Sequence, residues 1–248
     1  MIRAIWEFPD RLIGRQVIVY DQTDSTNNRA LAHAPQQGLA FLADEQTAGR
    51  GTQGRRWNAT PGASVLLSVL LHPPSHFRRA VLLTAWAAVS VQDTLASWGL
   101  AGRIKWPNDV LLRERKVAGI LTEIHAEAVV VGIGLNVQQS PDDWAKLGLN
   151  TATSLRMEGV KIETEQVARE LLMRLEMRYR QVLMTGVEEL ETSWRAGMEL
   201  VGKTVAIDYN GQTFLGQLSE LRFDLLSLSD GTSWRPEQVR LQEIPEGS

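Results

Sequence analysis

The sequence of 248 residues contains no cysteine. Disulfide bonds, thiolate nucleophiles and cysteine-ligated zinc are therefore excluded. Long apolar runs are also lacking, because no stretch reaches the roughly 18 apolar residues that a membrane-spanning helix requires. The first residues, Met-Ile-Arg-Ala-Ile-Trp, hold no apolar segment typical of a signal peptide. We therefore expect a cytoplasmic protein with no membrane partner.

The chain also has no excess of positive charge. Its 26 Lys and Arg residues are outnumbered by 29 Asp and Glu residues, so the formal net charge is −3. This balance argues against bulk electrostatic attraction to nucleic acid. The hydrophobic fraction of 44% and the charged fraction of 22% are ordinary for a globular protein with a sizeable core. The length suits one large domain, alone or with a small second one.

Positive charge is nevertheless concentrated in residues 45–57, which contain Gly49, Gly51, Gly54 and three arginines and end on Trp57. Glycines let a ligand approach the backbone closely, and free N–H groups and guanidinium groups bind anions. The stretch is therefore either a mobile loop that closes over a charged, phosphate-bearing ligand or a solvated basic turn. The residues of the stretch alone favour neither interpretation.

The three glycines also have the G-x-G-x-x-G spacing of dinucleotide-binding proteins. That motif requires a strand before the glycines and a helix after them. Here apolar runs predict strands on both sides of the loop, over residues 39–44 and 64–71, and no G-x-x-x-x-G-K-[ST] sequence occurs. We therefore reject a Rossmann fold.

Hydrophobic periodicity predicts the other elements of the first part of the chain. The predicted helices cover residues 28–34, 79–98, 164–184 and 187–196. The predicted strands cover residues 16–20, 39–44, 64–71, 103–106, 110–112, 117–124 and 128–136. Ser25 or Thr26 is the candidate N-cap of the first helix. Successive strands joined by tight turns imply an antiparallel or mixed sheet, and hence an α+β fold.

The pattern changes after residues 197–202. Short strands are predicted over residues 204–208, 212–218, 223–228 and 232–234. Asn210-Gly211 and Asp230-Gly231 are typical hairpin turns. The end of the chain therefore predicts a small five-stranded barrel or sandwich that docks on the main domain, because so small a unit has little core of its own.

Two glycines, Gly132 and Gly134, alternate within one predicted strand and so lie on the same face of the sheet. The missing side chains leave room for a flat ligand or another backbone, or else they mark a bulge or a closely packed helix. The pattern leaves these alternatives open.

Polar side chains near the predicted strand ends indicate the kind of chemistry in which the loop takes part. Lys105 and Lys116 add positive charge, and Asn108, Asp109 and Asn136 add hydrogen-bonding groups. No Ser-His-Asp arrangement and no carboxylate pair at helical spacing accompanies them. Such a set stabilises negative charge and offers little acid or base, which suits nucleotidyl or phosphoryl transfer.

Five ordered segments, residues 24–27, 46–57, 105–109, 115–121 and 132–136, resemble the motifs of biotin protein ligases. The match covers nearly the whole chain. The resemblance implies an α+β fold with a mixed sheet like that of class II aminoacyl-tRNA synthetases, with helices on one side, and a C-terminal SH3-like β-barrel. It implies a biotin- and ATP-binding catalytic domain over residues 1–198 and the SH3-like domain over residues 199–248.

The resemblance also implies an ATP-dependent, AMP-forming ligase. Biotin and MgATP would give biotinyl-5′-AMP and pyrophosphate, and a lysine of the biotin carboxyl carrier protein of acetyl-CoA carboxylase would then take the biotin. ATP and Mg²⁺ act as co-substrate and biotin as substrate, with no tightly bound cofactor. The oligomeric state stays open, a homodimer included.

Residue roles follow from the matching positions. The implied catalytic residues are Lys116, Arg50 and Lys105. The implied biotin-binding residues are Ser25, Thr26, Asn27, Gln46, Arg50, Gly51, Thr52, Trp57, Lys116, Gly132 and Gly134. The implied nucleotide-binding residues are Arg55, Asn108 and Asn136, and Asp109 is expected to help to bind magnesium.

The sequence departs from the family pattern in two places. Thr52 and Gln53 stand where the family loop often has arginines, and an arginine at position 52 would help to retain the adenylate. Retention is then either weakened or shifted to Arg50, Arg55 and Arg56. About fifteen residues precede the first predicted strand, too few for the winged helix-turn-helix of members that are also repressors. We therefore expect no binding to operator DNA.

Three alternatives accompany the biotin ligase. A lipoate ligase shares the fold and the adenylation chemistry, but the Gly-Arg loop and residues 105–109 favour biotin. A non-catalytic sensor of biotinyl-adenylate is disfavoured because Lys116 and Arg55 are retained and no DNA-binding domain is expected. A plain α+β domain with a basic surface loop is the third.

Overall fold

The computed structural model describes residues 1–126 and 128–244. The helices are α1 (Thr26–Ala32), α2 (Ala80–Ala96), α3 (Pro141–Leu147), α4 (Thr164–Thr185) and α5 (Glu188–Met198). The strands of the large sheet are β1 (Ile2–Glu7), β2 (Gln16–Thr23), β3 (Leu39–Gln46), β4 (Ser64–Leu71), β5 (Arg103–Lys105), β6 (Asp109–Leu112), β7 (Arg115–Ile124) and β8 (Val129–Asn136). The strands of the small sheet are β9 (Thr204–Tyr209), β10 (Gln212–Leu221), β11 (Leu226–Leu228), β12 (Ser233–Trp234) and β13 (Arg240–Glu243).

The large sheet is mixed, as the turns between its strands predicted. In the described residues its order is β1-β2-β3-β4-β8-β7-β6-β5. β2 and β3 run parallel, because α1 carries the chain back between them. The other neighbouring pairs run antiparallel. The arginine loop, residues 45–57, runs from the end of β3 toward β4, so the strand–loop–strand prediction is confirmed.

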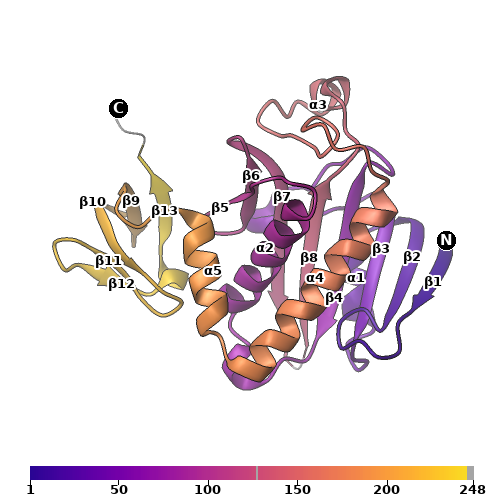
Figure 1. Ribbon diagram of the computed structural model, residues 1–248, viewed down its shortest axis with the longest axis horizontal. Coiled ribbons are helices and arrows are strands. Elements are labelled where there is room, and N and C mark those ends of the chain that lie inside the picture. Colours follow the sequence, from indigo (N-terminus) through magenta and orange to yellow (C-terminus); the bar gives the residue numbers. More distant parts are fainter. Residues whose placement is uncertain (127, 245–248) are drawn as a thin grey trace.

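Alternate residues of the central strands face two different layers. Val17 and Val19 of β2 belong to the large core under α2 and α4, whereas Ile18 lies in a second cluster with Ala30 of α1. Figure 1 shows α2 and α4 lying across one face of the sheet. The expectation of helices on one side is therefore wrong for α1, which packs on the opposite face because Ala30 joins the apolar side chains of β2, β3, β4 and β8 that point to that face.

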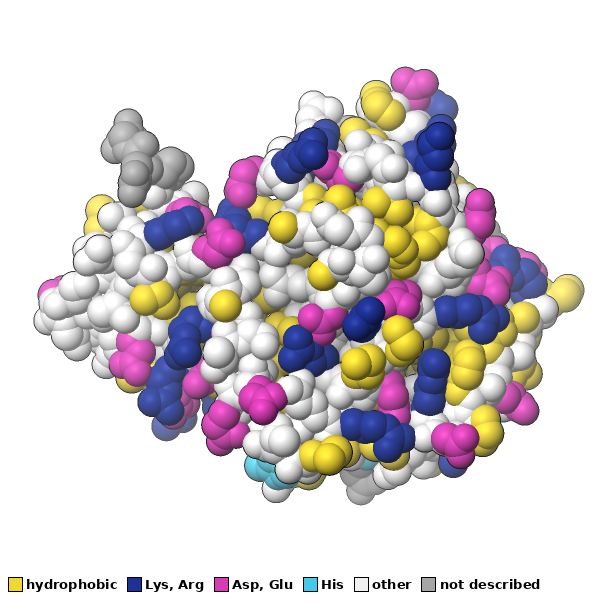
Figure 2. All heavy atoms as spheres, in the orientation of Figure 1, with side chains coloured by type: hydrophobic (Ala, Val, Ile, Leu, Met, Phe, Trp, Pro, Cys, Tyr) yellow, Lys and Arg dark blue, Asp and Glu magenta, His cyan; other side chains and the backbone are white. Residues whose placement is uncertain are grey.

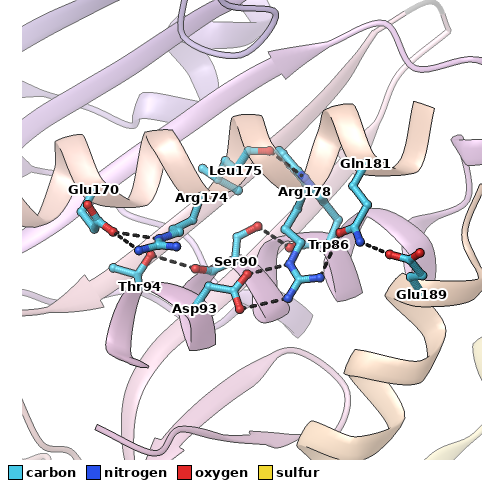
Figure 3. A network of polar contacts seen from close by, with 10 residues as sticks. All are labelled: Trp86, Ser90, Asp93, Thr94, Glu170, Arg174, Leu175, Arg178, Gln181 and Glu189. Carbon is cyan, nitrogen blue, oxygen red and sulfur yellow. Dashed lines mark hydrogen bonds and ion pairs between the residues drawn. The ribbon is translucent and has the colours of Figure 1, made fainter. Parts of the chain in front are cut away.

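Polar contacts join the helices of the main layer (Figure 3). Arg178 on α4 donates to both oxygens of Asp93 on α2, at 2.6 and 3.0 Å. The buried Trp86 indole donates to the carbonyl of Leu175 at 3.1 Å. Charges of both signs are interspersed over this face of the molecule (Figure 2). In the described residues no helix combines the length and apolar character needed to cross a membrane.

The small sheet has the order β12-β11-β10-β9-β13 in the described residues and lies beyond α5 (Figure 1). Phe223 stacks on Trp194 of α5, with ring centroids 4.9 Å apart, and its backbone N–H donates to Glu191 at 2.6 Å. The predicted fold class, a mixed sheet with helices and a small C-terminal five-stranded unit, is confirmed. The division after residue 198 stays a prediction, and residues 245–248 of the predicted domain lie outside the described residues.

Several predicted boundaries are wrong in detail. The first strand is β1, not residues 16–20, and the first helix begins at Thr26 with Ser25 at its N-cap, whose side chain makes no capping hydrogen bond. Between the strands predicted over residues 110–112 and 117–124, only Arg113 and Glu114 form the turn, both at positive φ, so β7 already begins at Arg115. The mostly polar segment 141–159 contains α3, and β13 completes the small sheet.

Candidate functional site

A cavity of about 480 Å³ lies on the sheet face that carries α1. Every residue that the sequence predicts for the site lines it. From α1 and its N-cap come Ser25, Thr26 and Asn27; from β3, Gln46; from the arginine loop, Arg50, Gly51, Thr52, Arg55 and Trp57; from β5 to β7, Lys105, Asn108, Asp109 and Lys116; and from β8, Gly132, Gly134 and Asn136. The structure thus gathers these residues at one place, while their individual roles stay predictions.

One wall of the cavity is polar and buried. Gln46 Oε1 accepts hydrogen bonds from the backbone N–H of Thr26 at 2.7 Å and from its hydroxyl at 3.1 Å. Ser68 of β4 lies beneath, with its hydroxyl 2.7 Å from that of Thr26 and 2.5 Å from Asn27 Oδ1. Ser25, Thr26 and Asn27 are all buried. Their donors and acceptors are therefore held in fixed positions, which suits recognition of a small polar ring.

The arginine loop is a folded hairpin. Arg50 and Arg56 form an antiparallel bridge, and the N–H of Gly51 donates to the carbonyl of Arg55 at 2.7 Å. Gln53 and Gly54 turn the chain with φ of 58° and 73°. The two ends of the hairpin close where the N–H of Trp57 donates to the carbonyl of Gly49 at 3.1 Å. The glycines thus serve the hairpin geometry as well as ligand access.

Trp57 packs flat on the sheet, where the side chains of two strands are missing. A Cβ at Gly119 would lie 2.8 Å from Trp57 Cζ3, and a Cβ at Gly134 would overlap the same ring. A Cβ at Gly132 would overlap the amide of Asn27. The glycine face therefore admits these side chains beside the cavity. The Trp57 indole N–H is buried without a hydrogen-bond partner in the described residues, so it is a donor that a ligand could satisfy.

Lys116 lies opposite the loop. Its Nζ is 2.6 Å from Asp109 Oδ1 and 5.4 Å from the centroid of the Trp57 ring. Asp109 is the residue expected to help bind magnesium, and here its carboxylate is the partner of a lysine. The described residues contain no group of three or more His, Asp or Glu side chains that could hold a metal ion. One carboxylate fits Mg²⁺ only in the way typical of nucleotide sites, where phosphate oxygens and water supply most of the ligands.

The two asparagines expected at the nucleotide use their amides to hold the protein together. Asn108 Nδ2 donates to the carbonyl of Ile120 at 2.8 Å. Asn136 is buried, and its Nδ2 donates to the carbonyl of Thr153 at 3.1 Å. Both therefore fix the walls of the cavity. Lys105, by contrast, is exposed at the rim of the cavity.

The contributors that sequence analysis missed include Ser68 and Glu123. They also include Trp144 and Leu149 of the segment around α3, which line the cavity. Glu123 joins Asn27 and Arg50, and the alternation of β7 from Gly119 could have indicated its face. Ser68 carried no signal, because it lies within an apolar run. Trp144 was hidden in a segment whose position depends on long-range backbone contacts.

Those contacts run through Lys116. Its backbone N–H donates to the carbonyl of Thr151 at 2.8 Å, and its carbonyl accepts from the N–H of Thr153 at 2.9 Å. The segment after α3 is therefore tied to β7 beside the lysine ammonium group. Trp144 and Leu149 of this segment consequently line the cavity.

The family model described as "Biotin/lipoate A/B protein ligase family" matches residues 19–140. Over 217 residues the chain is 38% identical to the biotin–[acetyl-CoA-carboxylase] ligase of Mycobacterium tuberculosis, covering 82% of this chain and 80% of that protein. It is 36% identical to the bifunctional ligase/repressor BirA of Bacillus subtilis over 83% of this chain. The match spans 66% of that relative's length.

Solved structures show the same fold. The biotin protein ligase from Aquifex aeolicus in complex with biotin and ATP superposes with a TM-score of 0.79 at 27% identity, covering 92% of this chain and 99% of that one. The biotin protein ligase from Leishmania major in complex with biotinyl-5-AMP has a TM-score of 0.59 at 20% identity, which supports the fold alone. It covers 92% of this chain and 98% of the other.

Proposed function

Since this chain belongs to the biotin protein ligase family, as its motifs predicted, we propose that it attaches biotin to a biotin carboxyl carrier protein in two steps. The biotin carboxylate attacks the α-phosphorus of MgATP, and pyrophosphate leaves with the electrons of the broken P–O bond. The amine of a carrier lysine then attacks the carbonyl carbon of biotinyl-5′-AMP. An amide forms, AMP leaves, and the amine loses a proton.

The observation that carries this proposal is the meeting of all five motifs at one cavity. They are spread from residue 24 to residue 136, and the sheet order brings their strands together. A basic surface turn would need no such convergence. The plain α+β domain with a solvated loop is therefore the weaker interpretation.

The cavity has the groups that each substrate part requires. The wall of Thr26, Asn27 and Gln46 offers donors and acceptors at fixed positions for the ureido ring. The indole of Trp57 offers an apolar surface and a free N–H. Lys116 brings a positive charge that would offset the negative charge that grows on the phosphate in the first step. Its pairing with Asp109 at 2.6 Å orients the ammonium group before substrate binds.

Magnesium belongs to the nucleotide substrate in this scheme. Asp109 would supply a protein oxygen for it, and the nucleotide phosphates would supply others. The ion would neutralise phosphate charge and so assist departure of pyrophosphate. The part of the work that falls to this chain is to bind, to orient and to stabilise charge, because the two carboxylates that line the cavity, Asp109 and Glu114, are each paired with a basic side chain.

Mass spectrometry of a carrier domain incubated with this protein, biotin and MgATP tests the proposal. We expect a gain of one biotinyl group on one lysine, and none when that lysine is replaced. ATP–pyrophosphate exchange with biotin and with lipoate separates the two ligases. Exchange with lipoate alone would assign lipoate as the substrate. Binding of biotinyl-adenylate without any exchange would indicate the non-catalytic sensor.

A further inference from the structure

Glu123 is a charged side chain on the cavity face of the sheet that the proposed reaction does not use. It lies on β7, two residues beyond Leu121 and four beyond Gly119, so the three project from one face. The hydroxyl of the adjacent Thr122 is 2.8 Å from that of Thr84 on α2, on the opposite face. The Glu123 carboxylate is therefore directed to α1 and the arginine loop.

This carboxylate joins two segments that are far apart in the sequence. Asn27 Nδ2, in the first turn of α1, donates to Glu123 Oε2 at 2.6 Å. Arg50 Nη2, in the loop, donates to the two carboxylate oxygens at 2.9 and 3.1 Å. The side chains are 28% exposed for Glu123 and 42% for Arg50. The pair is therefore close to solvent and can open without leaving a buried charge unpaired.

The opposite end of the Asn27 amide is held as well. Its Oδ1 is 2.5 Å from the Ser68 hydroxyl, which donates to it. Gly132 lies directly beneath, where any Cβ would overlap the amide. The amide thus has one orientation, which the Ser68 hydroxyl and the Glu123 carboxylate define together. A change at Glu123 would reach both the loop and the polar wall.

We propose that Glu123 is a positioning residue that latches the arginine loop to the biotin-binding wall before substrate arrives. The identity of the ligand in this inference rests on the proposed function, whereas the latch itself does not. A loop already held beside the wall has less conformational freedom to lose when the ligand binds, so the latch raises affinity without touching the ligand. Loop and wall also respond together, because one carboxylate contacts both.

Trypsin cleavage after Arg55 and Arg56 in the ligand-free protein tests the latch. Glu123→Gln keeps a carbonyl acceptor for Asn27 but removes the charge that holds Arg50. We expect loop cleavage to accelerate about threefold, in proportion to the loss of a part-exposed ion pair. The matched control is Glu165→Gln, which breaks the exposed pair of Glu165 with Arg169 on α4 and should cleave at the wild-type rate. Equal rates for all three proteins would overturn the latch.

Calorimetric titration with biotin tests its consequence. We expect Glu123→Gln to raise the Kd for biotin about threefold. The thermal unfolding midpoint of Glu123→Gln should equal that of Glu165→Gln. The double variant Arg50→Ala/Glu123→Gln should bind no more weakly than Arg50→Ala, because either change alone opens the latch. Additive losses would overturn the coupling. Wild-type protein that does not bind biotin contradicts the proposed function, while the trypsin comparison still decides on the latch.

Discussion

The ammonium group of Lys116 is held in position and is still accessible to a ligand. Its side chain is 34% exposed, with Asp109 on one side and the Trp57 ring on the other. We expect Lys116→Ala to slow biotin-dependent ATP–pyrophosphate exchange about 10²- to 10³-fold, the usual effect of removing one group that stabilises transition-state charge. The free energy of unfolding should fall by no more than about 1 kcal/mol, because the pair is part-exposed.

Lys161→Ala is the control for that experiment, since Lys161 is exposed and lies outside the cavity lining. It should exchange pyrophosphate at the wild-type rate. Full carrier labelling by Lys116→Ala would defeat the role assigned to Lys116.

Arg50 is the first arginine of a loop that has Thr52 and Gln53 at its centre, and we expect it to help to retain the adenylate. We expect Arg50→Ala to release biotinyl-5′-AMP into solvent, because the guanidinium group is lost and the loop is no longer held to Glu123. Biotinylation of lysines on an unrelated protein should rise severalfold over wild type. Arg169→Ala is matched in exposure, at 42%, and should not raise it. Labelling by Arg50→Ala that stays at the wild-type level would contradict the prediction.

At the scale of single residues, the sequence predicted the site residues that lie within motifs. It did not predict the residues that only the fold places beside those motifs. Arg50, Lys116 and the polar cluster at residues 25–27 were evident from local composition and resemblance. Ser68 and Glu123 were not, because each lies within a mostly apolar strand, and only the pairing of β4 with β8 and of β8 with β7 sets them beside Asn27.

At the scale of elements, β8 shows how a missing side chain shapes the site. Gly134 leaves room for Trp57, so Gly134→Ala must displace the indole. We expect the free energy of unfolding to fall by about 1–3 kcal/mol, as for other overpacked sites, and the biotin affinity to fall with it. Chemical denaturation measures the first and calorimetry the second.

The control for Gly134→Ala is the double variant with Trp57→Ala. Because the added methyl group then meets no ring, the effect of Gly134→Ala on stability should largely vanish in the Trp57→Ala background. An equal loss in both backgrounds would place the strain elsewhere in β8.

The N-terminal cap of helix α3 includes a titratable group, the carboxyl group of Asp143. The Ser140 hydroxyl and backbone N–H donate to Asp143, which holds the pKa of that carboxyl below its ordinary value of 3.8. The pKa of Asp143 is lower in the folded protein than in the unfolded chain. The cap therefore stabilises α3 fully above pH 3.8, and this stabilisation is lost as the pH falls through the folded pKa. We expect Asp143→Asn to increase hydrogen exchange in residues 141–147 at about pH 6, and to lose that difference in strong acid.

Asp142→Asn is the matched control, because Asp142 lies in the same first turn and makes no cap contact with Ser140. It should exchange like wild type at either pH. A pH-independent difference between Asp143→Asn and wild type would contradict the assignment to the cap. Because Trp144 follows directly and lines the cavity, fraying of α3 should also weaken ligand binding in acid.

Sequence analysis missed strand β1 and made the turn between β6 and β7 too long. β1 is an edge strand in which the apolar residues Ala4, Ile5 and Trp6 follow one another, so its sequence lacks the alternation of apolar and polar residues that predicts a strand. The β6–β7 turn uses Arg113 and Glu114 at positive φ, where the standard signal is Asn-Gly or Asp-Gly. In both places tertiary contacts, rather than local preference, determine the conformation.

At the scale of the whole molecule, one face of the large sheet stabilises the fold and the other face carries the candidate ligand-binding cavity. The face under α2 and α4 holds the main core, and the opposite face is left partly open for the cavity. The small sheet reaches the rim of that cavity through Arg103, which contacts Glu243 of β13 at 3.1 Å and also Glu114, one of the lining residues. Periodicity predicted both units, but their junction depends on contacts between residues far apart in the chain.

Phe223 is the apolar centre of that junction. It is 4% exposed and stacks on Trp194, while Arg79 donates to its carbonyl at 2.8 Å. We expect Phe223→Ala to cost about 3 kcal/mol and to loosen the small sheet ahead of the large one. Hydrogen exchange should then rise in residues 204–243 first. Phe77→Ala removes an equally buried ring beneath α4, next to Tyr179, and should raise exchange in the large sheet and helix layer instead. If both variants loosened the chain uniformly, the two sheets would form one cooperative unit and the junction would have no separate role.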